Sequence, residues 1–162
     1  MITSFGRMIG LPVVLGDREV GRVERAVPDA DVRALGGLVV RRGIGGAKWV
    51  TADAIELVGQ RCVMVRMRPS HAPKEDAARS TAALNTSGER LGEVTDALMR
   101  GDTLRVIALE VSRGPLYRIM GDSAYASSYA ARRESQAVVV HSLVSLAELQ
   151  RTLGEGEDEW AW

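Results

Sequence analysis

Apolar and polar residues alternate along much of the chain with a period of two, as in strands that bury one face and expose the other. The clearest run alternates three residues that we expect to be buried with three that we expect to face water: Ile107, Leu109 and Val111, and Ala108, Glu110 and Ser112. Turn-forming residues at 16–19, 28–31, 87–90 and 100–102 separate such runs. The pattern predicts short strands joined by tight hairpins.

The chain repeats itself at an offset of 71 residues. Residues 11–43 align with 82–114 without a gap, and eight of these 33 pairs are identical, where average residue usage predicts about two. The identical pairs are Gly21 and Gly92, Val23 and Val94, Ala26 and Ala97, Asp31 and Asp102, Leu38 and Leu109, Val40 and Val111, Arg42 and Arg113, and Gly43 and Gly114. Gly21 and Gly92 interrupt a strand pattern, which indicates a β-bulge or a tight barrel corner. We interpret the repeat as two copies of one strand-rich unit.

The two copies occupy residues 1–70 and 80–142, and a linker at 71–79 that combines proline with charge separates them. In the first copy, Thr51 is placed to cap a short turn at 51–55, and a closing strand follows at 62–67. The closing strand of the second copy, 137–140, aligns only at an offset of 75. Four residues are therefore inserted after Gly114.

After Ser142 the apolar period becomes helical, with leucines at 143, 146, 149 and 153. Ser145 and Glu148 have the spacing of a capping box, and Gly154 offers a stop. We therefore expect a C-terminal helix over 143–154, followed by an acidic tail at 155–162.

Each copy contains a leading strand, a Val/Leu-Gly-x-Val strand, an alternating strand that ends in Arg-Gly and a Val-rich closing strand. These features lie at 12–14, 21–23, 38–41, 55 and 63–65 in the first copy and at 92–94, 96–97, 108–111 and 138–140 in the second. The unit resembles the PRC-barrel family. The resemblance implies a mainly β fold of two tandem small antiparallel β-barrels, facing each other through a pseudo-twofold interface, with a C-terminal α-helix. It also implies an adaptor role, as in the photosynthetic reaction-centre H subunit or a ribosome-maturation factor, and no enzyme class.

Composition narrows the class of protein further. Apolar residues make up 46% of the 162 residues, and 21 basic residues balance 21 acidic ones, so no global positive field attracts nucleic acid or acidic lipid. The single cysteine, Cys62, cannot form an intramolecular disulfide, which favours a cytoplasmic protein. The apolar run near the N-terminus is too short for a membrane span, and we expect an extended strand from Pro12 instead.

The candidate catalytic and metal-binding residues form no recognisable set. His71 lies in the linker, His141 at the exit of a strand and Cys62 at the start of one, whereas nucleophilic catalysis needs such groups within hydrogen-bond distance. Acidic residues at 24–31 suit a turn better than a metal site, and the glycine-rich segment 43–48 lacks the second half of a phosphate-binding loop. We therefore expect no catalytic residue, no metal and no cofactor.

The inserted segment, 115–133, contains all three tyrosines of the protein and three arginines. These residue types anchor protein interfaces, and they also stack on single-stranded RNA. The candidate contact residues are Tyr117, Arg118, Tyr125, Tyr129, Arg132 and Arg133. Tyr125 and Tyr129 would share one face if 124–133 were helical. The alternative is that the tyrosines fold back over the second barrel.

The two halves of the chain carry opposite charge. Residues 1–71 have a net charge of +4 and residues 72–162 of −4, and the tail holds four of the acidic groups. Opposite halves allow head-to-tail or domain-swapped pairing in a homodimer, with Trp160 and Trp162 as apolar anchors, whereas a solvated tail needs no partner.

Taken together, the residues favour a non-catalytic cytoplasmic adaptor that binds a protein partner through 115–133 and the C-terminal helix. One alternative, by analogy with the family, is an RNA-associated role in ribosome maturation. The other is a small-ligand sensor that binds between the barrels.

Overall fold

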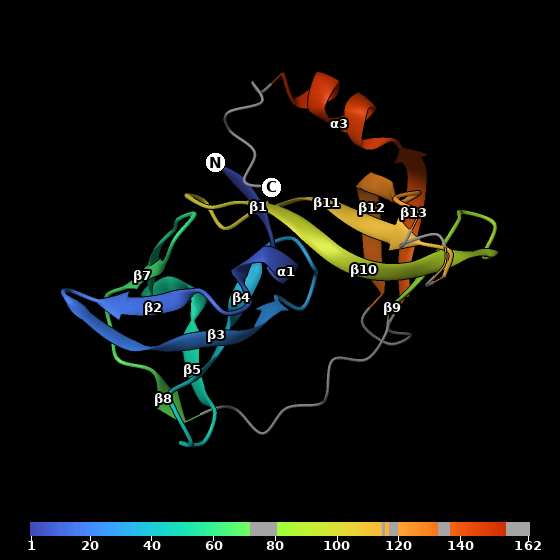
Figure 1. Ribbon diagram of the computed structural model, residues 1–162. Coiled ribbons are helices and arrows are strands. Elements are labelled where there is room, and N and C mark those ends of the chain that lie inside the picture. The colour runs from blue at the N-terminus through green and yellow to red at the C-terminus, as the bar shows by residue number, and fades with distance from the viewer. Residues whose placement is uncertain (72–80, 115, 117–119, 133–136, 155–162) are drawn as a thin grey trace.

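The computed structural model describes residues 1–71, 81–114, 116, 120–132 and 137–154, and in these ranges the chain is mainly β. The strands form two sheets that lie side by side (Figure 1). The helical segments of the described ranges are α1 (Phe5–Met8), the 3-10 helix η1 (Ala52–Ala54) and α3 (Leu146–Leu153). The expected linker, apart from His71, and the expected acidic tail lie outside the described residues.

The first sheet is an open half-barrel in the order β6-β7-β2-β3-β4-β5-β8. Its strands are β2 (Pro12–Leu15), β3 (Arg18–Pro28), β4 (Leu35–Arg41), β5 (Lys48–Thr51), β6 (Ile55–Val58), β7 (Val63–Val65) and β8 (Ser70–His71). Val13, Leu38 and Val63 are among the inward residues that form its apolar core. The expectation of a closed, wholly antiparallel barrel is wrong for this half, because β7 runs parallel to β2 and the two end strands do not pair in the described structure.

The second sheet runs in the order β1-β10-β11-β12-β13-β9, and pairing of β9 with β10 closes five of its strands into a barrel. Its strands are β1 (Ile2–Ser4), β9 (Thr81–Leu84), β10 (Arg90–Arg100), β11 (Val106–Ser112), β12 (Ala124–Arg132) and β13 (Ala137–Val144). Here too one pairing, between β13 and β9, is parallel. The closed barrel therefore belongs to the half that carries the insertion.

The inserted segment contributes β12, a strand, and not the helix considered for 124–133. This strand has nine residues against four in β5, and it pairs with β11 on one side and with β13 on the other, over six residue pairs. Hydrogen bonding to two neighbouring strands outweighs the four-residue spacing of Tyr125 and Tyr129, which is also compatible with a helix. The extra length of β12 closes the second barrel.

The hairpins β3–β4 and β10–β11 have the same register at the offset of 71 residues. Arg22 pairs with Arg41 and, correspondingly, Glu93 pairs with Ser112, and all six pairs of the first hairpin have such a counterpart in the second. Both hairpins shift register at the same two places. The predicted irregularity at Gly21 and Gly92 is confirmed, since the β2–β3 and β9–β10 pairings also shift there.

An antiparallel bridge between Ala34 and Arg105 joins the two halves, and these two positions correspond at the same offset. The Leu35 N–H donates to the Leu104 carbonyl and the Val106 N–H donates to the Arg33 carbonyl, each over 2.9 Å. Leu35 corresponds to Val106 and Arg33 to Leu104 at the offset of 71 residues, so each hydrogen bond is the counterpart of the other. The contact therefore has local twofold symmetry.

The N-terminal segment ties the halves together a second time. Strand β1 pairs with β10, and α1, which follows it directly, contacts both β3 and β10. Phe5 packs against the cores of both sheets, and the Asp96 carboxylate accepts a hydrogen bond from the Gly6 N–H over 3.0 Å. The two halves thus form one packed body.

Helix α3 begins at Leu146, three residues later than expected, because β13 continues to Val144. Its predicted capping box is confirmed: Ser145 Oγ accepts from the Glu148 N–H, and Glu148 accepts from the Ser145 N–H. Gly154 ends the helix with a positive φ of 63°. Thr51, by contrast, makes no side-chain capping hydrogen bond to η1.

A third apolar cluster lies beneath α3. The expectation that Ala108 and Ser112 of β11 face water is wrong. Ala108 is fully buried there beside Leu149, and Ile107 packs against the same cluster. The second register shift of the hairpin falls at Ile107, so strict alternation stops at that point. Ser112 is also buried, and its hydroxyl donates to the Gly114 carbonyl over 2.9 Å.

Candidate functional site

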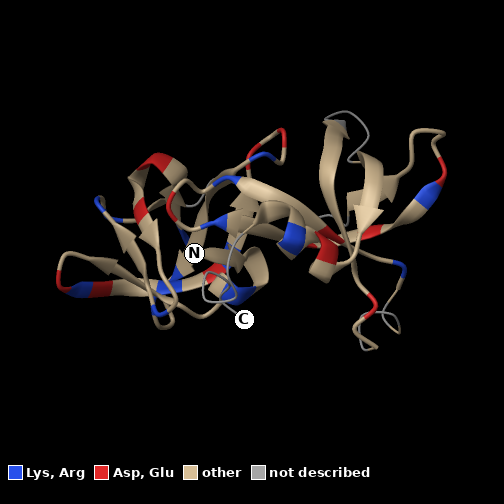
Figure 2. Ribbon diagram, turned by 90° about the horizontal axis from the view of Figure 1, so that it is seen from above, with Lys and Arg blue, Asp and Glu red and all other residues tan. Residues whose placement is uncertain are grey.

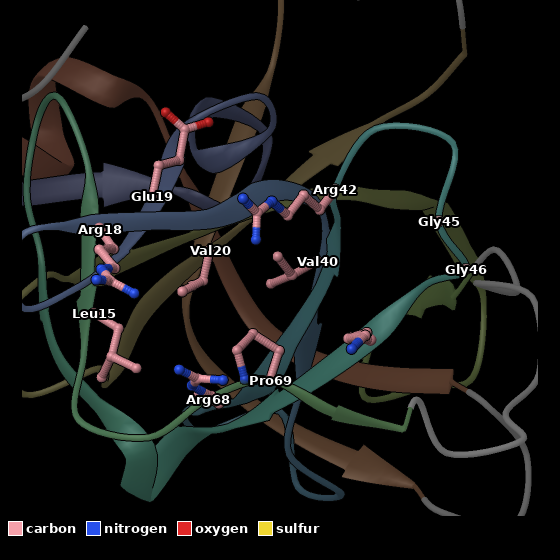
Figure 3. Close-up of a pocket in the computed structure, with 11 residues that line it drawn as sticks. Leu15, Arg18, Glu19, Val20, Val40, Arg42, Gly45, Gly46, Arg68 and Pro69 are labelled. Atoms are coloured by element: carbon pink, nitrogen blue, oxygen red, sulfur yellow. The ribbon is translucent and has the colours of Figure 1, made fainter.

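A pocket of about 560 Å³ opens at the end of the first half-barrel (Figure 3). Three connections surround it, namely the β2–β3 hairpin, the β4–β5 loop and the segment between β7 and β8. Its lining residues are Leu15, Arg18, Glu19, Val20, Val40, Arg42, Gly45, Gly46, Lys48, Arg68 and Pro69. The volume is in the range of pockets that hold small ligands or a few protein side chains.

The pocket combines an apolar floor with a cationic rim. Figure 3 shows Val20, Val40 and Pro69 at its centre, with Arg42 and Arg68 on either side of them. Val40 belongs to the core of the half-barrel, so the floor is fixed by packing. The rim carries four exposed cations, Arg18, Arg42, Lys48 and Arg68. A partner that fits this arrangement has both negative charge and apolar side chains.

The rim cations are unpaired within the described part of the chain. No ion pair joins any of the four to an acidic side chain there, whereas Arg41, next to Arg42, is paired with Glu24 on the outside of the sheet. Hydrogen bonding to Arg41 is the main cause that lowers the pKa of Glu24. Glu19, the acidic residue of the pocket lining, forms an ion pair with Arg22 over 3.2 Å, and its side chain points away from Val20 in Figure 3. The positive charge of the rim is therefore left for a ligand.

The difference in strand length explains why the open end belongs to the first half. In the second half, the long β12 and β13 pair along their length, and Leu143 of β13 packs against the barrel core. In the first half, β7 has only three residues and β5 has four. The short strands leave Val20 half-buried at the mouth, whereas Val40, which also lines the pocket, is buried in the core.

The structure places Tyr129, one of the predicted contact residues, inside the protein. Its ring belongs to the core of the second barrel and is 2% exposed. Its hydroxyl donates to the Val32 carbonyl of the first half over 2.6 Å. The Arg33 guanidinium lies over the ring, 4.6 Å from its centroid, and donates to the Tyr129 carbonyl. Tyr129 therefore links the two halves.

Tyr125 is buried as well, but on the opposite face of β12, in the cluster beneath α3 with Leu149. Tyr125 and Tyr129 are thus both packed within the second half of the protein. Of the remaining predicted contact residues, Tyr117, Arg118, Arg133 and the side chain of Arg132 lie outside the described residues. Exposed apolar side chains of the same segment are Leu116 and Met120, at 73% and 80%. A partner-binding role for 115–133 stays a prediction.

Because Tyr125 and Tyr129 are buried, we expect the free energy of unfolding to fall at alkaline pH. Burial raises the pKa of Tyr129 and of Tyr125 from 10 to about 12. The unfolded chain ionises these groups first, so their stabilisation is complete below pH 10 and is lost as the pH rises towards 12. Urea unfolding across this window should show a falling free energy of unfolding. Tyr129→Phe should reduce the slope by about 1 kcal/mol per pH unit, and an unchanged slope would contradict the assignment.

A second cavity, of about 280 Å³, lies between the halves. Phe5, Val32 and Leu109 are among its apolar lining residues, and Ile9 at its edge is 58% exposed. Asp96 also lines it, and its carboxylate accepts hydrogen bonds from the backbone of Gly6 and Ala97. This is the place where a small apolar ligand would bind between the halves.

The candidate catalytic residues stay apart. His71 and His141 are exposed, Cys62 is half-buried, and in the described ranges none of them makes a side-chain hydrogen bond. The described residues contain no group of three His, Cys, Asp or Glu side chains placed to hold a metal ion. Asp29 accepts the Arg33 N–H over 2.8 Å, as is usual for a turn aspartate.

Comparison with known proteins adds no assignment: no family model matches the chain, and no curated protein matches it. No helix in the described part of the chain is long and apolar enough to cross a membrane.

Proposed function

We propose that this protein is a non-catalytic adaptor whose first half binds an anionic protein segment in the pocket at its open end. The four unpaired cations around a fixed apolar floor support this proposal. A carboxylate on the rim replaces water around guanidinium groups in a charge-assisted hydrogen bond. An apolar side chain of the partner that packs on the floor is removed from water, and this hydrophobic burial stabilises the complex.

A protein segment suits the pocket better than RNA does. Single-stranded RNA is usually held by aromatic side chains on which bases stack, and the pocket lining has no aromatic residue. Figure 2 shows Lys and Arg interspersed with Asp and Glu along the described chain of both halves, whereas binding of a phosphate backbone is favoured by clustered cations. Preferential binding of single-stranded RNA over an acidic peptide would instead favour the RNA-associated role.

We also propose that the two halves are copies of one PRC-barrel-like unit, one open and one closed. The shared register of the hairpins and the twofold bridge at Ala34 support this proposal. In this scheme the closed copy is the structural support and the open copy is the binding unit. We place the protein in the cytoplasm, where its single free cysteine, Cys62, remains reduced.

A labelled octapeptide of Glu and Trp tests the pocket by fluorescence anisotropy. We define the pocket variant as Arg42→Glu with Arg68→Glu, and the control variant, of equal charge, as Arg61→Glu with Arg113→Glu. Arg61 and Arg113 are exposed and lie outside the pocket. The pocket variant should bind the octapeptide at least about tenfold more weakly than the wild type, because attraction becomes repulsion. The control variant should bind as the wild type does.

Other outcomes separate the alternatives. Equal weakening in both double variants would mean that net charge, and not the pocket, attracts the peptide. Binding of a labelled single-stranded RNA octamer in preference to the peptide, with a steep loss in salt, would favour the RNA-associated role. A rise in melting temperature with a small apolar compound, abolished by filling the cavity through Ala26→Leu, would favour the sensor.

A further inference from the structure

We infer that the segment bound in the pocket is the acidic, tryptophan-containing segment 155–162 of a second copy of this chain. This inference rests on the proposed function of the pocket and names its partner. Two features of the same chain carry the inference: a pocket with a cationic rim and an apolar floor, and a segment in which acidic residues stand beside two tryptophans.

The chemistry of the segment matches the pocket in both respects. It contains Glu155, Glu157, Asp158 and Glu159, followed by Trp160 and Trp162. Its four acidic groups match the four cations on the rim in number and are opposite in sign. The tryptophans supply large apolar surfaces for the half-buried side chains of Leu15, Val20 and Pro69 on the floor.

The position of α3 indicates a second copy as the donor. Segment 155–162 starts at Gly154, where α3 ends, and α3 packs over the second barrel. Figure 1 shows α3 and strand β5, which contributes Lys48 to the pocket, on opposite sides of the molecule. Eight residues span at most about 28 Å when fully extended. A chain packed beside this one can place its segment in the pocket without crossing the width of the fold.

Self-association would also explain the division of charge in the sequence. Residues 1–71, which form the pocket, carry +4, and the −4 of residues 72–162 is the charge of segment 155–162, because residues 72–154 have no net charge. Opposite charges of this kind steer two copies into a head-to-tail encounter. Reciprocal exchange of two segments closes such an assembly as a dimer.

Sedimentation velocity of the full chain tests the inference, together with two variants that each lack one side of the contact. The first is the pocket variant, and the second is a tail variant with Glu157→Lys, Glu159→Lys and Trp160→Ser. We expect the wild type and the control variant to associate as concentration rises, and each of the two test variants to be monomeric alone. Their equimolar mixture should associate again, because the tail variant keeps an intact pocket and the pocket variant keeps an intact segment.

The possible results separate the inference from the proposed function. A wild type that stays monomeric, or a mixture that fails to recover association, would overturn the second copy as the partner. If the Glu and Trp octapeptide still binds the tail variant in that case, the proposed function stands and another protein is the partner. If the octapeptide does not bind either, both fail. Circular dichroism melts of every variant, expected within a few degrees of the wild type, check that folding is intact.

Discussion

Replacing Tyr129 with alanine is expected to lower the free energy of unfolding by about 4 kcal/mol. Three interactions are lost at once: the packing of a ring that is 2% exposed, the hydrogen bond to the Val32 carbonyl and the stacking of Arg33. The cavity would open where the second barrel meets the first half. Equilibrium unfolding in urea, followed by circular dichroism, measures the change.

Two further variants make this prediction specific. Tyr129→Phe keeps the ring and removes only the hydroxyl, so it should cost about 1–2 kcal/mol. Ser128→Ala, at an exposed position of the same strand, should change stability by less than about 0.5 kcal/mol. A Tyr129→Ala variant as stable as Ser128→Ala would show that Tyr129 does not link the halves.

Gly92→Ala should destabilise the protein by about 3 kcal/mol. A Cβ added at Gly92 would lie 2.4 Å from the Ser112 carbonyl oxygen and 2.9 Å from its carbonyl carbon. Backbone atoms of a paired strand cannot yield as a flexible side chain does, so the β10–β11 hairpin would have to separate. The midpoint of thermal unfolding should therefore be lower for Gly92→Ala than for the wild type, although the variant adds only one methyl group.

Gly46→Ala is the matched control for the same change. No atom lies within 4 Å of a Cβ built at Gly46, and its φ is not in the left-handed region. We expect a midpoint equal to or slightly above that of the wild type. Similar losses for Gly92→Ala and Gly46→Ala would mean that the close approach of β10 and β11 is not the cause.

The elements that the sequence predicted well depend on local chemistry. Gly21 and Gly92 stand out because a glycine inside a strand pattern indicates a β-bulge or a tight barrel corner, and the strand pairing shifts register at both positions. The capping box of Ser145 and the stop at Gly154 depend on residues within one or two turns of the helix. Such features are visible without knowledge of what packs against them.

Strand β12 was harder to predict because its partners decide its structure. Tyr125 and Tyr129 are four residues apart, which suits one face of a helix and also a strand. Register shifts between them place the two side chains on opposite faces of β12, one beneath α3 and one inside the barrel. Neither the pairing nor these shifts has a signal in the order of residues alone.

The pocket could not be predicted from the sequence. Its cations are far apart in the sequence, and only the pairing of β2 with β3 and β7 and of β3 with β4 brings Arg18, Arg42 and Arg68 to one end of the sheet. The glycines of segment 43–48 stand out in the sequence, but the part that this segment plays in lining the pocket depends on its neighbours in the fold. The one useful signal in the sequence was the excess of positive charge in the first half.

Amide chemical shifts test most directly the claim that the open first half is the binding unit. The isotopically labelled tail variant, whose own segment cannot compete, would be titrated with the peptide of residues 155–162. We predict the largest shifts at Val20, Arg42, Gly45 and Gly46, with little change across β11 to β13. Shifts centred instead on Phe5 and Ile9, or on residues 116 and 120, would contradict the account.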